Sequence, residues 1–149
     1  MSTKTMNGQV EILLVEDILD DVIMTKRALK KGKVSNNVNV VSNGVEALSY
    51  LRREESYADA PRPDLILLDL NMPKKDGREV LAEIKSDDQL KQIPVIVLTT
   101  SQAEQDILDA YSLHANCYIA KPVDLGEFMK IIDSLENFWF NIATTPPIE

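Results

Sequence analysis

The sequence predicts an α/β domain in which helices cover both faces of a parallel sheet. Five short apolar runs alternate along the chain with segments whose apolar residues recur at helical spacing. The runs are continuous instead of alternating with polar residues, which is typical of strands buried on both faces. Right-handed crossovers between such strands place the connecting helices on the two sides of the sheet.

The first two strand and helix units lie within residues 11–51. Residues 11–15 form the first predicted strand, and a helical pattern follows until Lys30-Lys31-Gly32 ends it. The apolar positions of this helix are Ile18, Val22, Thr25 and Leu29. Residues 38–41 are the second predicted strand, and Asn43-Gly44 is a turn that can cap the next helix. The core face of that helix consists of Ala47, Leu48 and Leu51.

The third strand follows a polar segment, residues 52–62, that is predicted to be a surface connection. Residues 65–68 are all apolar, and the strand ends on Asp69. Pro73 prevents its continuation, and Asp76-Gly77 supplies the chemistry of a turn and a helix start. The next helix has Val80, Leu81 and Ile84 on its core face. Taken alone, Asp69 could equally well be a cap for the loop that follows, so its role depends on what lies near it.

The last two units extend to residue 142. Residues 94–98 are the fourth predicted strand, ended by Thr99, and residues 117–119 are the fifth, closed by Lys121-Pro122. The helix predicted between them has Ala103, Ile107, Ala110 and Tyr111 on one face. The final helix has its apolar positions at Phe128, Ile132, Leu135, Trp139 and Ile142.

Composition limits the class of protein. A chain of 149 residues, 44% of them hydrophobic, is expected to form one domain over residues 10–143, between an N-terminal extension (1–9) and a tail (144–149). The formal net charge of -8 argues against a nucleic-acid-binding surface. No apolar run reaches the length of a membrane span, and the first residues are too polar for a signal peptide, so a cytoplasmic protein is expected. Cys117 is the only cysteine, which excludes an intramolecular disulfide.

Polar residues with compatible chemistry follow the predicted strands. They are Glu16, Asp17, Asp69, Thr99 and Lys121. Because the carboxyl ends of parallel strands share one edge of the sheet, these side chains are expected to meet there. Three neighbouring carboxylates repel one another, and a divalent cation relieves the repulsion; Mg²⁺ suits a half-open site, since it needs few carboxylates and keeps several waters. A lysine and a hydroxyl suit phosphoryl oxygens, so the set predicts phosphoryl transfer onto Asp69 to give an acyl phosphate.

In chain order the pattern is Glu16-Asp17, Asp69-x-x-Met72-Pro73-x-x-Asp76-Gly77, Thr99 and Tyr118-x-x-Lys121-Pro122. It resembles the receiver domain of two-component response regulators, over roughly the whole domain. The resemblance implies a flavodoxin-like, doubly wound, five-stranded parallel sheet of strand order 2-1-3-4-5. It also implies that Asp69 accepts the phosphoryl group from a phosphohistidine of a histidine kinase.

The same resemblance implies a role for each site residue. Asp17, Asp69 and the backbone carbonyl of Asn71 would hold Mg²⁺, with Glu16 acting through a water molecule. Lys121 would bind the phosphoryl group, and Thr99 and Tyr118 would be the switch pair.

Three finer features resemble the stand-alone regulators paired with cyanobacterial phytochromes. They are the long polar segment before Pro63, the run from Leu113 to Tyr118, and the Phe138-Trp139 end of the last helix. This narrower resemblance implies a phytochrome-type histidine kinase as the upstream partner and leaves the downstream protein unidentified.

The aromatic run at residues 138–140 predicts an interface. One helical stripe of ordinary width cannot bury three consecutive aromatic side chains. Trp139 belongs to the stripe that faces the sheet, so Phe138 and Phe140 are predicted to lie in a symmetric homodimer contact.

Two other functions remain open at this point. A metal-dependent phosphatase with an aspartyl nucleophile carries a second aspartate two residues further on as general acid, but this chain has Asn71 there, which cannot donate that proton. A degenerate receiver that serves only as a binding module is the other alternative. The intact acidic pair, with Asp69, Thr99 and Lys121, argues against it, and Mg²⁺-dependent phosphorylation would separate the two.

Overall fold

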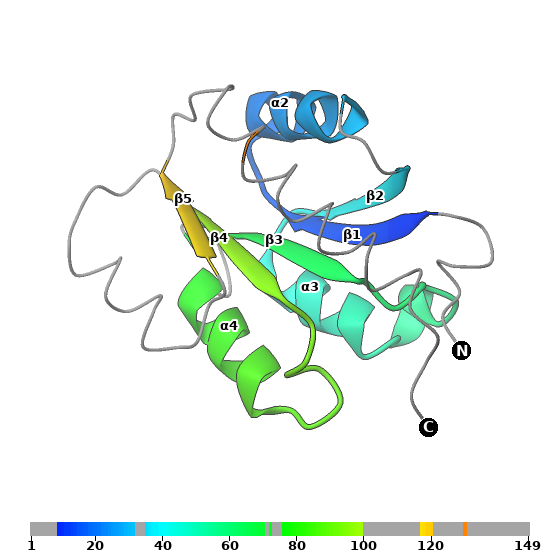
Figure 1. Ribbon diagram of the computed structural model, residues 1–149. Coiled ribbons are helices and arrows are strands. Elements are labelled where there is room, and N and C mark those ends of the chain that lie inside the picture. Colours follow the sequence, from blue (N-terminus) through cyan, green and yellow to red (C-terminus); the bar gives the residue numbers. More distant parts are fainter. Residues whose placement is uncertain are drawn as a thin grey trace.

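A five-stranded, fully parallel sheet forms the centre of the molecule (Figure 1). The computed structural model describes residues 9–31, 35–70, 72, 76–99, 117–120 and 130, with residues 99 and 117–120 described by their backbone alone. The strands are β1 (Val10–Val15), β2 (Asn36–Val41), β3 (Leu65–Asp69), β4 (Val95–Thr99) and β5 (Cys117–Ala120). Their order is β2-β1-β3-β4-β5, which confirms the predicted doubly wound topology.

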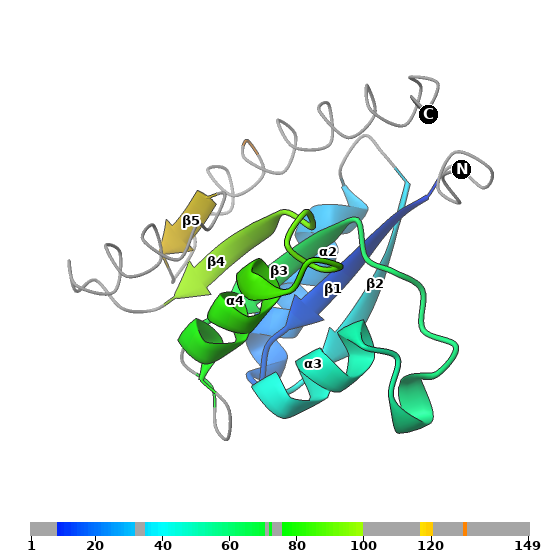
Figure 2. The same ribbon diagram turned by 90° about the horizontal axis from the view of Figure 1, so that it is seen from below.

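Helices cover both faces of this sheet. The helix α2 (Leu19–Lys30) lies on one face, and α3 (Gly44–Leu51) and α4 (Gly77–Ser86) lie together on the other (Figures 1 and 2). A short 3-10 helix, η1 (Glu55–Tyr57), follows α3 in the segment that the sequence marked as a surface connection. The helix predicted around residues 103–111 lies outside the described residues, and of the final predicted helix only Lys130 is described, as helical and exposed.

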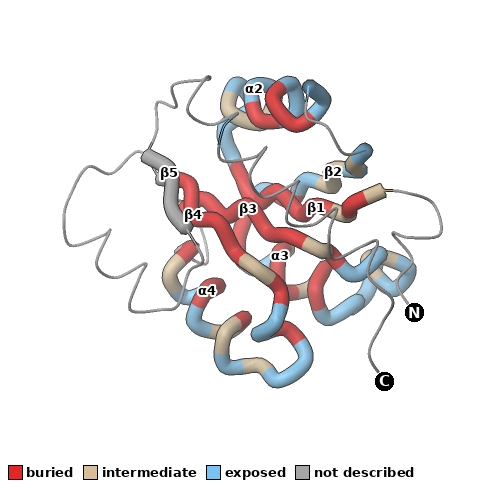
Figure 3. The backbone as a smooth tube through the Cα atoms, viewed as in Figure 1, coloured by how far each residue is buried: buried red, intermediate tan, exposed pale blue. Residues whose placement is uncertain are grey.

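The core has one layer on each side of the sheet, because successive strand residues point to opposite faces. Along β3, Ile66 and Leu68 pack toward α3 and α4, whereas Leu65 and Leu67 pack toward α2. Residues 65–68 are all buried, as their continuous apolar run predicted, and β1, β3 and β4 form the buried centre in Figure 3. The predicted core faces of α3 and α4 are confirmed. Their buried residues include Ala47, Leu48, Leu51, Val80, Leu81 and Ile84.

Several boundaries differ from the sequence prediction by one or two residues, and two of these differences have a physical reason. The strand β2 begins two residues earlier, at Asn36, because its backbone pairs with β1 although its first residues are polar and partly exposed. The first helix begins at Leu19, and Ile18 is its N-cap and 45% exposed. The fully buried residues of that helix are Thr25, Ala28 and Leu29, whereas Val22 is partly buried and packs against the same core layer.

The C-terminus of α3 has a left-handed residue that is not glycine. The backbone N–H of Arg53 donates to the carbonyl of Tyr50 at 3.1 Å, and the N–H of Glu54 donates to that of Ser49 at 2.9 Å. This pair of bonds is the Schellman arrangement, in which the residue at the position of Arg53 is usually glycine. Arg53 has φ 55, and Glu55 has φ 53. The turn therefore places an arginine where the backbone favours glycine.

We expect Arg53→Gly to stabilise the fold by about 0.5–1 kcal/mol, because glycine removes the left-handed strain and only part of that gain is lost to greater freedom of the unfolded chain. Denaturant unfolding measures the change. Arg52→Gly is the matched control, since Arg52 has φ -91 and glycine relieves nothing there. Equal destabilisation by both substitutions would contradict this account of the turn.

The connection from α4 to β4 is held by its own polar contacts. The Nζ atom of Lys85 donates to the carbonyls of Lys91 at 3.2 Å and Ile93 at 3.1 Å. Burial lowers the pKa of Lys85 from its ordinary value. The carboxylate of Asp87 accepts a bond from the backbone N–H of Gln89 at 2.8 Å. This short connection is therefore fixed relative to the end of α4.

Candidate metal centre

The ends of β1 and β3 bring the predicted acidic residues together. Glu16 directly follows β1, and its N–H continues the ladder to β2 by donating to the Val41 carbonyl at 3.0 Å. Asp69 is the last residue of β3 and lies opposite Leu98 of β4. Because β1 and β3 are adjacent and parallel, their carboxyl ends open on the same edge of the sheet.

At this edge, one ligand oxygen from each of Glu16, Asp17 and Asp69 lies within 4.8 Å of the other two. Glu16 and Asp69 are only 1% and 2% exposed, whereas Asp17 is exposed. One oxygen of Glu16 also accepts a bond from the N–H of Ile18 at 3.2 Å, which fixes its carboxylate. The sequence prediction that these three residues converge is confirmed.

This donor set fits a divalent cation. Three carboxylates this close, two of them buried, repel one another unless a positive charge lies between them. Three hard oxygen donors with one open side suit a cation that keeps part of its water shell, as Mg²⁺ does. The exposed Asp17 side leaves room for those waters or for oxygens of an incoming group.

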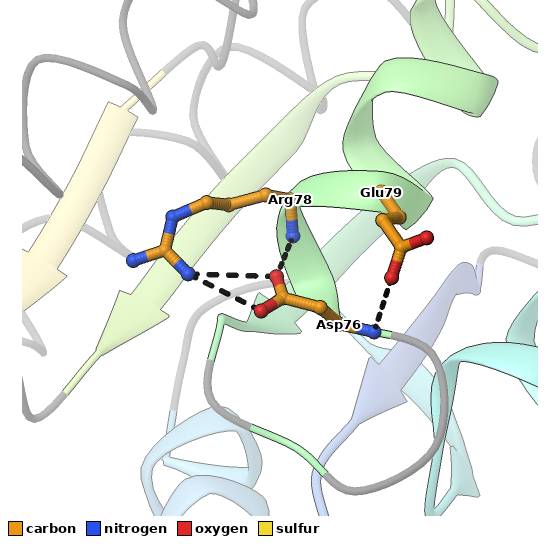
Figure 4. Close-up of polar contacts among 3 residues, drawn as sticks. All are labelled: Asp76, Arg78 and Glu79. Atoms are coloured by element: carbon orange, nitrogen blue, oxygen red, sulfur yellow. Dashed lines mark hydrogen bonds and ion pairs between the residues drawn. The ribbon is translucent and has the colours of Figure 1, made fainter.

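The loop after Asp69 returns to the sheet through the start of α4. Asp76 caps this helix in a capping box: its carboxylate accepts from the N–H of Arg78 at 2.6 Å, and Glu79 accepts from the N–H of Asp76 at 3.2 Å (Figure 4). The guanidinium of Arg78 also contacts the Asp76 carboxylate at 3.3 Å. Asp76 therefore has a structural role at the helix start and is not part of the carboxylate cluster.

Gly77 packs directly on the backbone of the central aspartate. Its N–H donates to the Leu70 carbonyl at 3.0 Å. A Cβ added at Gly77 would lie against the Asp69 carbonyl oxygen and 2.5 Å from the Leu70 Cα. The sequence identified Gly77 as part of a turn and helix start and of the receiver pattern. Its contact with Asp69 depends on how closely α4 approaches the end of β3, which the sequence alone did not reveal.

The other predicted site residues are placed only in part. Thr99 is the last residue of β4, opposite Ala120, and Tyr118 of β5 lies opposite Val97. In the ladder, the backbone of Thr99 lies one position beyond the Leu98 partner of Asp69, and that of Tyr118 lies one position before it. The side chains of both residues are not described. Asn71, Lys121, Phe138 and Phe140 lie outside the described residues. Among the described helices, none has the length and hydropathy that a membrane crossing requires.

A parallel sheet of this order with an acidic cluster at its carboxyl edge is the architecture of a response regulator receiver domain. The family model of that domain matches residues 12–133, and the chain belongs to this family. Its members are signalling proteins and not conventional enzymes.

Within the family, this chain is similar to phytochrome response regulators. It is 46% identical to the response regulator Rcp1 of Synechocystis sp. over 135 residues, covering 91% of this chain and 92% of that protein. The solved structure of the phosphorylated cyanobacterial phytochrome response regulator RcpA is 53% identical, with a TM-score of 0.80 over 93% of this chain and 99% of that one. The Mn²⁺-bound form of Rcp1 is 45% identical, with a TM-score of 0.79 over the same shares of the two chains.

Proposed function

We propose that this chain is a response regulator that accepts a phosphoryl group on Asp69 from a histidine kinase, in a reaction that requires Mg²⁺. The single observation that carries the proposal is the cluster of Glu16, Asp17 and Asp69 within 4.8 Å, with Asp69 buried at the end of the central strand. The solved structures of a phosphorylated RcpA and a Mn²⁺-bound Rcp1 support both parts of it.

In the transfer, a carboxylate oxygen of Asp69 forms a bond to phosphorus while the phosphorus–nitrogen bond of the kinase phosphohistidine breaks. The imidazole leaves and takes up a proton. A bound Mg²⁺ supplies positive charge that neutralises the phosphoryl oxygens. Asp17, Asp69 and the carbonyl of Asn71 would hold it, with Glu16 acting through water, and Lys121 would bind the phosphoryl group.

The upstream partner we propose is a phytochrome-type histidine kinase in the cytoplasm, because the relatives with the highest identities reported above include regulators named for phytochromes. Mixing the chain with such an autophosphorylated kinase tests this. Transfer of the label to the chain is expected with Mg²⁺ present. Hydrolysis of small phosphate esters without labelling of the chain would favour the phosphatase alternative. If neither labelling nor hydrolysis occurs, the result favours the binding-module alternative.

Thr99→Ala is expected to leave phosphorylation intact and to uncouple it from partner affinity. A new dianion on Asp69 would attract the Thr99 hydroxyl as a charge-assisted donor, and Tyr118 would change rotamer to fill the vacated space. Such coupling is typically about 1–3 kcal/mol, so phosphorylation should change partner affinity roughly 5- to 150-fold in the wild type and little in the variant. Binding of a partner to both phosphorylated proteins measures the effect. Equal affinities would show that this relay is wrong.

A homodimer through Phe138 and Phe140 is also part of the proposal. Burial of each aromatic side chain contributes about 1.5–3 kcal/mol, and a two-fold contact repeats each gain. Phe138→Glu with Phe140→Glu should yield a folded monomer that still accepts phosphate on Asp69. Sedimentation of both proteins at micromolar concentration tests this, and a wild type that stays monomeric with and without phosphodonor would refute it.

A further inference from the structure

Three of the five arginines of the chain line one pocket on the side of the sheet covered by α3 and α4. The pocket has a volume of about 280 Å³. Arg52 and Arg53 follow the end of α3, Arg62 precedes β3, and the connection after α4 supplies the opposite wall. These segments lead into the starts of β3 and β4, so the pocket lies at the opposite edge of the sheet from Asp69.

The positive charges in this pocket are poorly compensated. In the described part of the chain, Arg53 and Arg62 form no salt bridge with a carboxylate. Arg52 contacts Glu83 at 3.3 Å, but both side chains are more than a third exposed, where such pairs are weak. Three arginines therefore line one pocket in a protein whose formal net charge is -8.

Glycine at position 53 would make the turn more stable than Arg53 does. Its left-handed backbone, φ 55, is a conformation that glycine adopts without strain. Strained residues of this kind are concentrated at functional sites. Arg62 comes from a separate segment, so a favourable interaction with the C-terminus of α3 does not account for all three arginines.

Two leucines, a glutamine and an aspartate line the rest of the pocket. Leu51 and Leu90 contribute apolar surface and are only 9% and 4% exposed. Gln89 also lines the pocket, and its backbone N–H donates to the Asp87 carboxylate at 2.8 Å. Among the described residues, Asp87 is the one acidic residue that lines it, and its bond to Gln89 keeps it within the turn.

We propose that this pocket binds a compact polyanion, a small molecule that carries at least two phosphate or carboxylate groups. Guanidinium groups bind both kinds of oxyanion through paired, charge-assisted hydrogen bonds. Three arginines can bind more than one anionic group of the same ligand. The volume lies near the lower limit of small-molecule sites, which favours a ligand no larger than a diphosphate or a tricarboxylate. This inference is independent of the phosphoryl transfer proposed for Asp69.

Calorimetric titration of the full chain with pyrophosphate, and separately with citrate, tests the proposal in Mg²⁺-free buffer. Saturable binding of one equivalent is expected, and the stronger of the two probes identifies the preferred oxyanion. Arg53→Gly and Arg62→Gln should each weaken binding about tenfold, the effect of losing a charge-assisted contact. Asp87→Asn keeps an acceptor for Gln89 and removes a negative charge, so it should strengthen binding.

Two matched controls separate this site from general attraction. Glu55→Gly makes the same substitution at the other left-handed residue and should not weaken binding. Arg27→Gln removes one positive charge on α2, across the sheet, and should change the affinity less than twofold, roughly the scale of a distant surface charge. Because Arg53→Gly is expected to stabilise the fold, loss of binding in that variant is not a loss of structure. Absence of saturable binding to the wild type at millimolar probe would overturn the proposal. So would equal weakening by Arg27→Gln and Arg62→Gln, or binding of an acidic peptide with no binding of either probe.

Discussion

Replacing Asp69 with asparagine is expected to abolish covalent labelling of the chain by a small phosphodonor. The substitution keeps the size of a side chain that is 2% exposed, but it removes the carboxylate oxygen that would attack phosphorus. Labelling with acetyl phosphate and Mg²⁺, followed by mass measurement of the intact protein, detects the loss. Asp76→Asn is the control: asparagine caps a helix about as well as aspartate, and Asp76 caps α4 and contacts Arg78 outside the carboxylate cluster, so labelling should persist.

Asp69→Asn should also change the stability of the fold. Three carboxylates within 4.8 Å repel one another when no cation is bound. Removing one charge should therefore raise the free energy of unfolding in metal-free buffer, by an amount on the order of 1–3 kcal/mol. Mg²⁺ should then stabilise the wild type more than Asp69→Asn. A variant that is less stable than the wild type in metal-free buffer would contradict the repulsion assigned to this cluster.

Gly77→Ala is expected to destabilise the fold by about 2–3 kcal/mol and to slow phosphorylation of Asp69. The new methyl group would lie 2.5 Å from the Leu70 Cα and against the Asp69 carbonyl, and neither backbone atom can rotate away. The cost of overpacking exceeds the 0.5–1 kcal/mol, roughly, that alanine gains over glycine in a helix. Because the displaced backbone carries the phosphoacceptor, labelling should slow by about 10- to 100-fold.

Denaturant unfolding and labelling kinetics measure the two effects of Gly77→Ala together. Ala82→Gly, at an exposed position of the same helix, is the matched control. It should cost about 1 kcal/mol through helix propensity alone and leave the labelling rate unchanged. A Gly77→Ala protein with wild-type stability and labelling rate would show that the approach of α4 to Asp69 is not as close as described.

Much of the fold could be predicted because its signals are local in sequence. The continuous apolar run at 65–68 indicated a strand buried on both faces, and all four residues are buried in the structure. The acidic cluster was predicted from topology, since parallel strands share their carboxyl edge. Local patterns failed where pairing overrode composition. Asn36 joins β2 through backbone pairing with β1 although its side chain is polar.

Other features depend on contacts between distant segments or on backbone conformations that no pattern marked. The sequence could not show that Glu16 is buried while the adjacent Asp17 is exposed, because that depends on how the chain turns after β1. Arg53 occupies a left-handed position that is usually glycine, so no glycine in the sequence indicated the turn there. Its pocket with Arg62 requires α3, the start of β3 and the end of α4 to be neighbours. The polar segment 52–62 therefore indicated only a surface connection.

The most direct test of the phosphoacceptor assignment is to locate the modified residue. The chain is treated with a small phosphodonor, with and without Mg²⁺, and the labelled peptide is identified by mass spectrometry. We expect one phosphoryl group, attached to Asp69 only when Mg²⁺ is present, and a loss of that metal dependence in Asp17→Asn. Stable labelling of a different residue, or labelling of Asp69 at the same rate without a divalent cation, would contradict it.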